Sequence, residues 1–415
     1  MKIIKNKSKG IDPKALIVTA DCSKGKHVGY FRSPDWEDVK PFKFDNTKPG
    51  FELFWQKVEN FRQSKNLERI IFGYESTGNY SICLAAYMLK RGAIVYQVNP
   101  KHSNRLKELQ GNSPNTTDQK DPRVIADILM LNHGLTFLMP KGKIADLRHM
   151  VHNRERIQED IIRVKNRIEA LLAIMFPEYP IIMRGLRSKT SLYFLRHYPT
   201  PADILTLGLE KLTEQMMNVS MKRLGKSRAQ ALYSAAEHTI GVTEGVSGMR
   251  KMMNMLTEQS ELLEHQLVSI ENQIRPLAEQ IPVHRILTSI RGIGLITSVI
   301  IITEIVDFGA YQSASEVIKL AGLDLFEISS GKHKGKLRIS KRGRSLLRKA
   351  LYFASLNMVG KNGIFYQQYQ RYRVKGNPGP KALTAIGKKL LRVIFAMVKN
   401  NTLYQPDYKQ LQIAA

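Results

Sequence analysis

The chain has 415 residues, of which 43% are hydrophobic, and it carries 64 Lys and Arg against 36 Asp and Glu. This composition indicates a globular protein of more than one domain and excludes a disordered chain. The formal net charge of +28 points to a polyanionic partner such as nucleic acid. The sequence has no apolar run of about 18 residues, so we expect no membrane span. Two cysteines, Cys22 and Cys83, cannot build a disulfide framework, which favours a cytoplasmic protein.

Residues 1–14 are expected to form a basic tail without a secretory signal, because no apolar segment follows them. Residues 15–142 then alternate between strand and helix patterns. The apolar strands expected at 15–20 and 69–74 end at Asp21 and Glu75, and a further strand is expected at 93–98. This pattern predicts an α/β domain that binds its ligands at the carboxyl ends of the strands.

Four acidic residues of this domain are candidate metal ligands and catalytic residues: Asp21, Glu75, Asp118 and Asp121. Together they suit one or two Mg²⁺ ions, with Mn²⁺ as the alternative, because these ions prefer oxygen ligands and hold substrate phosphates. Singly, each has a simpler interpretation. Asp21 could start a turn, Glu75 could cap the next helix, and Asp121 before Pro122 could be a helix N-cap. Two strands that each end in an acid favour the metal site.

Residues 143–283 read as helical, with apolar residues at heptad spacing from Met150 to Met175 and again from Met249 to Ile281. This spacing predicts a coiled coil. The two stripes could pair within one chain or with a second protomer, and the spacing leaves both arrangements open. Between them, at about 178–245, we expect a basic helical insert.

Residues 284–403 are expected to form a mainly α-helical domain, followed by a tail at 404–415. At 284–306 two apolar helical segments flank Gly292-Ile293-Gly294. This resembles a helix-hairpin-helix element, whose backbone N–H groups can contact a phosphate. A tight helical turn is the alternative.

A serine pair, Ser329-Ser330, precedes Gly331 and a run of cations. A serine hydroxyl among such cations could attack a phosphate, because they would stabilise the developing charge. The alternative is a turn on a solvated basic face. Tyrosines beside Arg371 and Arg373 could stack on bases or pack in the core. The candidate nucleic-acid-binding residues are Gly292, Gly294, Lys332, Lys334, Lys336, Arg338, Lys341, Arg342, Arg344, Arg348, Arg371 and Arg373.

Several motifs in this order resemble the transposases of the insertion-sequence 110 group, the DEDD transposases related to Piv-type invertases. The motifs are Asp21 after its strand, Glu75-Ser76-Thr77-Gly78-Asn79-Tyr80, Asn99-Pro100, Thr117-Asp118-Gln119-Lys120-Asp121, Gly292-Ile293-Gly294, Ala321-Gly322-Leu323, Ser330-Gly331, and Ile339-Ser340-Lys341-Arg342-Gly343. Pro122 departs from the family pattern and is expected to delay the following helix by one residue.

The resemblance implies a RuvC-like domain of the RNase H fold at 15–142, a coiled coil at 143–283 and a C-terminal transposase domain at 284–403. It implies that Asp21, Glu75, Asp118 and Asp121 bind metal and that Ser330 forms a transient phosphoserine with DNA. It further implies dimers that assemble into tetramers, and a bridge RNA that pairs with target and donor DNA.

The resemblance therefore implies an RNA-guided, Mg²⁺-dependent DNA recombinase in the nucleoid of a bacterial or archaeal cell. Two other interpretations remain open. The first is a RuvC-type metal nuclease or junction resolvase that works without the serine. The second is a non-catalytic coiled-coil scaffold that binds nucleic acid.

Overall fold

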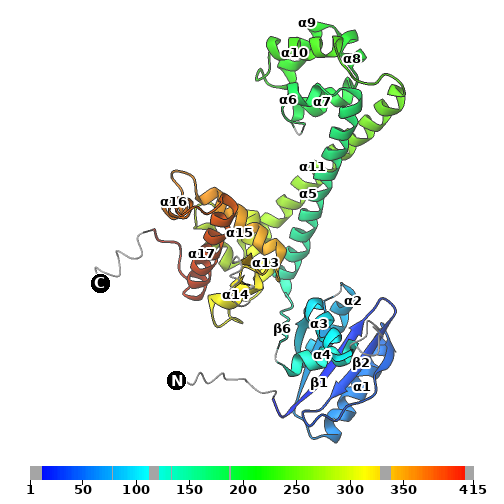
Figure 1. The fold of residues 1–415 in the computed structure, drawn as a ribbon, viewed down its shortest axis with the longest axis vertical. Coiled ribbons are helices and arrows are strands. Elements are labelled where there is room, and N and C mark those ends of the chain that lie inside the picture. Colours follow the sequence, from blue (N-terminus) through cyan, green and yellow to red (C-terminus); the bar gives the residue numbers. More distant parts are fainter. Residues whose placement is uncertain are drawn as a thin grey trace, which may run out of the picture. The chain divides into compact units, whose positions relative to one another are not determined.

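A computed structural model describes residues 12–76, 78–111, 121–131, 133–186, 188–327 and 338–406. It divides into two compact units, Met1–Met139 and Pro140–Ala415, which we describe separately (Figure 1). The finer division of the second unit into a coiled coil, an insert and a C-terminal domain stays a prediction.

The first unit is an α/β unit built on one mixed sheet. Its strands are β1 (Ala15–Cys22), β2 (Lys26–Arg32), β3 (Phe42–Asp45), β4 (Arg69–Glu75), β5 (Ile94–Val98) and β6 (Leu135–Thr136). They lie in the order β3-β2-β1-β4-β5-β6. The three central strands β1, β4 and β5 are parallel, whereas β2, β3 and β6 run antiparallel to their neighbours. The helices are α1 (Lys48–Ser64), α2 (Tyr80–Lys90), α3 (Pro100–Gly111) and α4 (Asp121–Met130).

Alternate residues of β1 enter two different cores, because successive side chains of a strand point to opposite faces. Leu16 and Val18 join a cluster that includes Phe54 of α1 and Leu84 of α2. Ile17 faces the other way and joins a cluster with the apolar residues of α4. The sheet is therefore covered by α1 and α2 on one face and by α4 on the other, as the sequence pattern predicted for an α/β domain.

The second unit is mainly helical, and two 34-residue helices form its stem: α5 (Gly142–Met175) and α11 (Val246–Glu279). Their heptad-spaced residues are buried, including Ile161 and Ile168 of α5 and Leu263 of α11. The two stripes thus pair within the chain, which is one of the two arrangements that the spacing left open.

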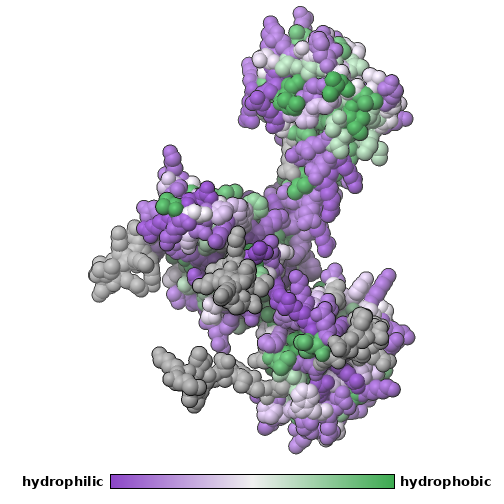
Figure 2. Space-filling model, viewed as in Figure 1, coloured by the Kyte–Doolittle hydropathy of each residue, from purple (hydrophilic) through white to green (hydrophobic). Residues whose placement is uncertain are grey.

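In the described residues, five short helices lie between the two stem helices in sequence, in the region where a helical insert was expected. They are α6 (Tyr179–Met183), α7 (Lys189–His197), α8 (Pro201–Leu207), α9 (Leu209–Val219) and α10 (Lys226–Glu237). Figure 2 shows hydrophobic residues gathered over part of this insert, and Ile181, Met221 and Ile240 are among its exposed apolar residues.

Beyond the stem, the second unit contains further helices and a two-stranded hairpin. The elements are α12 (Pro282–Thr288), α13 (Leu295–Ile305), α14 (Ala314–Leu320), β7 (Leu325–Phe326), β8 (Arg338–Ile339), α15 (Ser345–Met358), α16 (Tyr366–Val374) and α17 (Gly379–Lys399). Helix α13 packs on α15, and α15 packs on α17. These three helices carry much of the local core. Of the helices in the described ranges, none has the length and apolar character needed to span a membrane.

Candidate catalytic and nucleic-acid-binding sites

The carboxylates of Asp21 and Glu75 come from neighbouring strands of the first unit. β1 and β4 are parallel, and Ala20 lies opposite Tyr74 in their register. Asp21 and Glu75 follow directly, so both stand at the carboxyl ends of adjacent strands. Both residues are half-buried. The structure therefore brings these two predicted ligands to one edge of the sheet, where α/β sheets bind ligands.

A cysteine, Cys22, follows Asp21 at this edge of the sheet. Burial raises the pKa of Cys22 to about 12, and the negative charge of Asp21 contributes in the same direction. A thiol must lose its proton to bind metal or act as a nucleophile. Cys22 therefore stays protonated at neutral pH in the protein without a bound metal.

Helix α4 begins against the same strand. The buried Thr19 hydroxyl donates a 2.6 Å hydrogen bond to the carbonyl of Pro122. Thr19 and Asp21 share one face of β1, since they are two residues apart, and α4 packs on this face. α4 starts at Asp121, so the expectation that Pro122 delays the helix by one residue was wrong. Proline is acceptable there because the first-turn N–H groups of a helix lack intrahelical partners.

A glycine lets α4 also approach β4. A Cβ atom at Gly73 would lie 2.4 Å from Leu129 Cδ1 and 3.3 Å from Ile125 Cγ2, distances shorter than ordinary contacts. Gly73 stands two residues before Glu75. The main chain of Asp121 is thus fixed by a helix that contacts β1 and β4 just before both carboxylates.

The donor chemistry at this edge fits a divalent cation, because carboxylate oxygens are the ligands that Mg²⁺ prefers. Asp118 lies outside the described residues, and the side chain of Asp121 is not described. Within the described part of the chain, no three His, Cys, Asp or Glu residues are close enough to hold a metal ion. The structure brings together two of the four predicted ligands and places the helix that carries a third.

The serine pair and Lys332, Lys334 and Lys336 lie outside the described residues, but both ends of their segment are described. β7 pairs antiparallel with β8, with Leu325 opposite Ile339 and Phe326 opposite Arg338. Three backbone hydrogen bonds connect the residues before β7 to those after β8: Ser340 N to Asp324 O at 2.8 Å, Lys341 N to Gly322 O at 3.0 Å, and Arg344 N to Leu320 O at 2.8 Å. The described residues on either side of this segment are therefore joined in one hairpin base.

Two glycines make this base possible. Gly322 has φ +66°, a conformation that favours glycine. A Cβ atom at Gly343 would lie 2.3 Å from the carbonyl oxygen of Leu320 and 2.6 Å from the nitrogen of Gly322. The sequence motifs at 321–323 and 339–343 are thus two halves of one packed structure.

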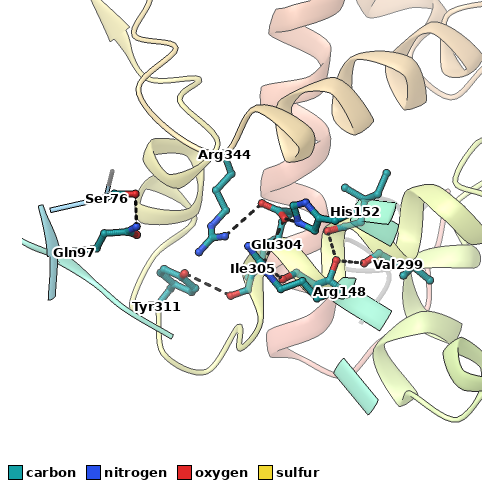
Figure 3. A network of polar contacts seen from close by, with 11 residues as sticks. Ser76, Gln97, Arg148, His152, Val299, Glu304, Ile305, Tyr311 and Arg344 are labelled. Atoms are coloured by element: carbon teal, nitrogen blue, oxygen red, sulfur yellow. Dashed lines mark hydrogen bonds and ion pairs between the residues drawn. The ribbon is translucent and has the colours of Figure 1, made fainter. Parts of the chain in front are cut away.

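A buried carboxylate on α13 connects this base to the stem (Figure 3). Glu304 is 3% exposed, and its Oε1 lies 2.9 Å from His152 Nε2 and 3.4 Å from Arg148 Nη1. Its Oε2 lies 3.5 Å from Arg344 Nη1. Burial alone would raise the pKa of Glu304, but the His152 hydrogen bond and the charges of Arg148 and Arg344 outweigh it and lower that pKa. Glu304 is therefore ionised at neutral pH.

The sequence analysis missed this cluster, since Glu304 received no role there. The signal in the sequence was the apolar helix around Glu304. Glu304 is the single charged residue of Leu295–Ile305, and a buried charge requires partners. The partners themselves, Arg148 and His152, are too distant in sequence for any pattern to identify.

The predicted nucleic-acid-binding residues fall into two groups. Arg338, Lys341, Arg342, Arg371 and Arg373 are exposed. Arg344 and Arg348 are half-buried and have protein partners, since Arg344 pairs with Glu304 and Arg348 Nη1 donates to Ala321 O at 2.9 Å. A contact between any of these residues and nucleic acid stays a prediction.

The Gly292-Ile293-Gly294 turn connects α12 to α13, as the sequence predicted. Gly292 has φ +106°, a conformation that favours glycine, and a Cβ there would lie 2.9 Å from Met358 Cγ, so backbone conformation and packing together account for this glycine. Gly294 is the N-cap of α13 and has open space around it. The phosphate-binding role stays a prediction for both residues.

Two family models match the chain. Residues 18–177 match a DEDD transposase model of the IS110 type, described as a transposase. Residues 284–370 match the model of the transposase IS116/IS110/IS902 family. Together they match more than half of the 415 residues.

Proteins of three insertion elements are similar over most of their length. The uncharacterized 44.8 kDa protein of insertion element IS116 from Streptomyces clavuligerus is 23% identical over 390 residues, which are 94% of this chain and 96% of that protein. The uncharacterized 43.6 kDa protein of IS110 from Streptomyces coelicolor is 24% identical over 70% of this chain and 72% of that protein. The uncharacterized 42 kDa protein of IS900 from Mycobacterium paratuberculosis is 24% identical over 70% and 73%. The chain belongs to the IS110/IS116 family of insertion-element transposases.

Proposed function

We propose that this transposase exchanges DNA strands through a phosphoserine at Ser330, with a divalent ion held by Asp21, Glu75, Asp118 and Asp121. One observation carries the proposal. Asp21 and Glu75 stand at the ends of adjacent parallel strands, and the helix that begins with Asp121 is pinned to the same face. The fixed hairpin base around the serine segment supports the second half of the proposal.

The fold of each unit supports the finer family assignment. A sheet in the order β3-β2-β1-β4-β5 with β2 antiparallel to its neighbours supports an RNase H-like, RuvC-like domain. The paired heptad stripes of α5 and α11 support a coiled coil.

In the proposed reaction the Ser330 hydroxyl attacks the scissile phosphorus. The Oγ–P bond forms as the bond from phosphorus to the leaving nucleotide oxygen breaks. The hydroxyl proton leaves, and the departing oxygen takes up a proton. A DNA hydroxyl later attacks the phosphoserine, which restores Ser330 and joins the new strand, so no external energy source is needed. A bound Mg²⁺ or Mn²⁺ ion would offset charge on the phosphate oxygens, and the surrounding cations would do the same.

The proposed partners are target and donor DNA, a bridge RNA that pairs with both, and further copies of the chain in dimers and tetramers. The positive charge of the C-terminal region supports nucleic acids as partners, because the sequence from 338 to 406 has 15 Lys and Arg and no Asp or Glu. A protein that binds DNA in this way would act in the nucleoid.

The test compares Ser330→Ala with its neighbour Ser329→Ala on labelled DNA that carries the element's ends. We expect Ser330→Ala to abolish the covalent protein–DNA adduct on a denaturing gel and to abolish strand exchange, whereas Ser329→Ala keeps both. Asp21→Asn and Glu75→Gln should abolish cleavage but leave DNA binding intact. Cleavage by Ser330→Ala at the wild-type rate, without any adduct, would instead establish the metal-nuclease alternative.

A further inference from the structure

An open hollow of about 640 Å³ lies between α16 and α17. Cations from α17 line it: Lys388, Lys389 and Arg392. Lys388 and Arg392 are four residues apart, as are Lys389 and Val393, so each pair lies along the same side of the helix. Apolar residues between these cations, including Ala385, Val393 and Ala396, provide a carbon-rich floor.

A chain of hydrogen bonds fixes α16 against this side of α17. Lys389 Nζ donates to Gln368 Oε1 at 2.8 Å, and Gln368 Nε2 donates to Tyr372 Oη at 3.2 Å. Lys389 keeps two further N–H donors. In the described part of the chain, Lys388 and Arg392 have no carboxylate partner within ion-pair distance. The hollow therefore presents three cations to an anion, and a hydrogen bond holds one of them, Lys389, in place.

A second hollow of about 500 Å³ adjoins the first, because Gln368 and Tyr372 line both. Arg371 and Lys375 contribute cations to it. Tyr372 thus stands between two neighbouring hollows, each with an apolar portion and a cationic rim. Figure 2 shows hydrophilic residues over much of this part of the second unit.

We propose that the two hollows bind a single strand of nucleic acid, with bases against Tyr372 and the carbon-rich floor and phosphates on Lys388, Lys389 and Arg392. Exposed base faces are available in a single strand, whereas a duplex buries them in its own stack, and stacking platforms with cations are typical of single-strand sites. The inference rests on the proposed function for nucleic acid as the partner and adds the surface and the strandedness.

The position of this surface matters for the reaction. Leu325 of β7 also lines the first hollow, and β7 leads directly into the segment that carries Ser330. A strand held by α16 and α17 therefore lies beside the hairpin base. Lys388, Lys389 and Arg392 were not among the residues predicted from sequence to bind nucleic acid, whereas Tyr372 is one of the tyrosines that the sequence left open between stacking on bases and packing in the core.

The experiment measures the affinity of the full chain for labelled oligothymidylate, oligouridylate and duplex DNA across a salt series. The variant is Lys388→Gln/Lys389→Gln. Its matched control, Lys211→Gln/Lys251→Gln, removes two exposed lysines from α9 and α11. We expect the variant to lose about tenfold in single-strand affinity and to reduce the salt slope by about 1.4, the value for two lost phosphate contacts. The control should match the wild type.

A second pair separates stacking from charge. Tyr372→Leu should weaken single-strand binding about fivefold to a hundredfold with an unchanged salt slope, whereas Tyr372→Phe keeps its ring and should bind like the wild type. Selective loss of oligouridylate or of oligothymidylate binding would identify the strand as RNA or DNA.

Equal affinity of the Lys388→Gln/Lys389→Gln variant and its control for single strands would overturn the inference. So would a loss confined to duplex DNA. Either result would leave the proposed function standing as long as the wild type binds DNA. A wild type that binds none of the three probes would refute the proposed function as well.

Discussion

At the scale of single residues, one hydroxyl positions the helix that carries a proposed metal ligand. Thr19 is fully buried within a mostly apolar strand, and its hydrogen bond reaches Pro122, 103 residues later in the chain. The bond fixes the first turn of α4 beside Asp21. Thr19 does not itself contact substrate in this scheme, so it is a positioning residue.

Thr19→Val keeps the shape of the side chain and removes this bond. We expect it to destabilise the first unit by only about 1 kcal/mol. Without this bond the first turn of α4 is less well aligned with β1. We therefore expect the cleavage rate to fall about tenfold and the Mg²⁺ concentration needed for half-maximal activity to rise. A second readout is the shift in melting temperature that Mn²⁺ induces, measured across a metal titration. Thr19→Ser keeps the hydroxyl and should restore both, whereas a wild-type metal dependence in Thr19→Val would contradict the role.

Glu304 makes stability depend on pH in a defined direction. Its pKa is lowered in the folded protein from the ordinary value of 4.5. Its contribution is therefore complete above about pH 4.5 and is lost as the pH falls through the lower pKa of the folded state. At neutral pH, Glu304→Gln leaves Arg148 and Arg344 without this counter-charge.

We expect Glu304→Gln to cost about 3 kcal/mol of unfolding free energy at pH 7. The difference from the wild type should shrink as the pH falls from 4.5 through the lower pKa of folded Glu304, because the wild-type carboxyl becomes protonated over this range. Denaturant unfolding of both proteins at several pH values measures this. A difference that stays constant with pH would show that the loss comes from packing and not from charge.

At the scale of elements, the hairpin base formed by Gly322 and Gly343 holds the serine segment. A Cβ atom at Gly343 would meet backbone atoms of Leu320 and Gly322, which cannot move aside as a flexible side chain can. The geometry of this element therefore depends on the absence of one side chain.

Gly343→Ala should separate residues 341–344 from the end of α14 and abolish formation of the protein–DNA adduct. Gly360→Ala is the matched control, since a Cβ at Gly360 has nothing within 4 Å. We expect the control to retain wild-type adduct formation and both proteins to keep their helical circular-dichroism spectrum. Adduct formation by Gly343→Ala at the control's level would show that the base tolerates a shift.

Elements with a strong local pattern could be predicted from sequence. The strands at 15–20, 69–74 and 93–98 were expected because continuous apolar runs ended by acids or proline mark buried strands. The heptad stripes of α5 and α11 were expected for a similar reason. β7 and β8 were not expected, because two-residue strands are specified by their pairing and carry no periodicity of their own.

At the scale of the whole molecule, the parts that sequence could not supply are long-range contacts. Heptad spacing predicts that a stripe is buried but not which partner buries it. His152 and Glu304 are 152 residues apart, and nothing local marks them as a pair. For the carboxylate site, strand ends predicted where Asp21 and Glu75 lie, whereas the Thr19 contact that positions α4 depends on the assembled sheet.

Because α5 is attached to Glu304 near its beginning, a small tilt of the stem there displaces its far end by a larger distance. Arg148 and His152 lie near the beginning of α5, and the helix continues to Met175, roughly 40 Å further on at 1.5 Å per residue. A tilt of about 5° at the Glu304 end would displace the far end by about 3–4 Å, as follows from that length. Arg344 contacts the same carboxylate, and its backbone N–H bonds the end of α14, so we expect such a tilt to reach the hairpin base through this buried charge as well as through the packing of α5 on α13.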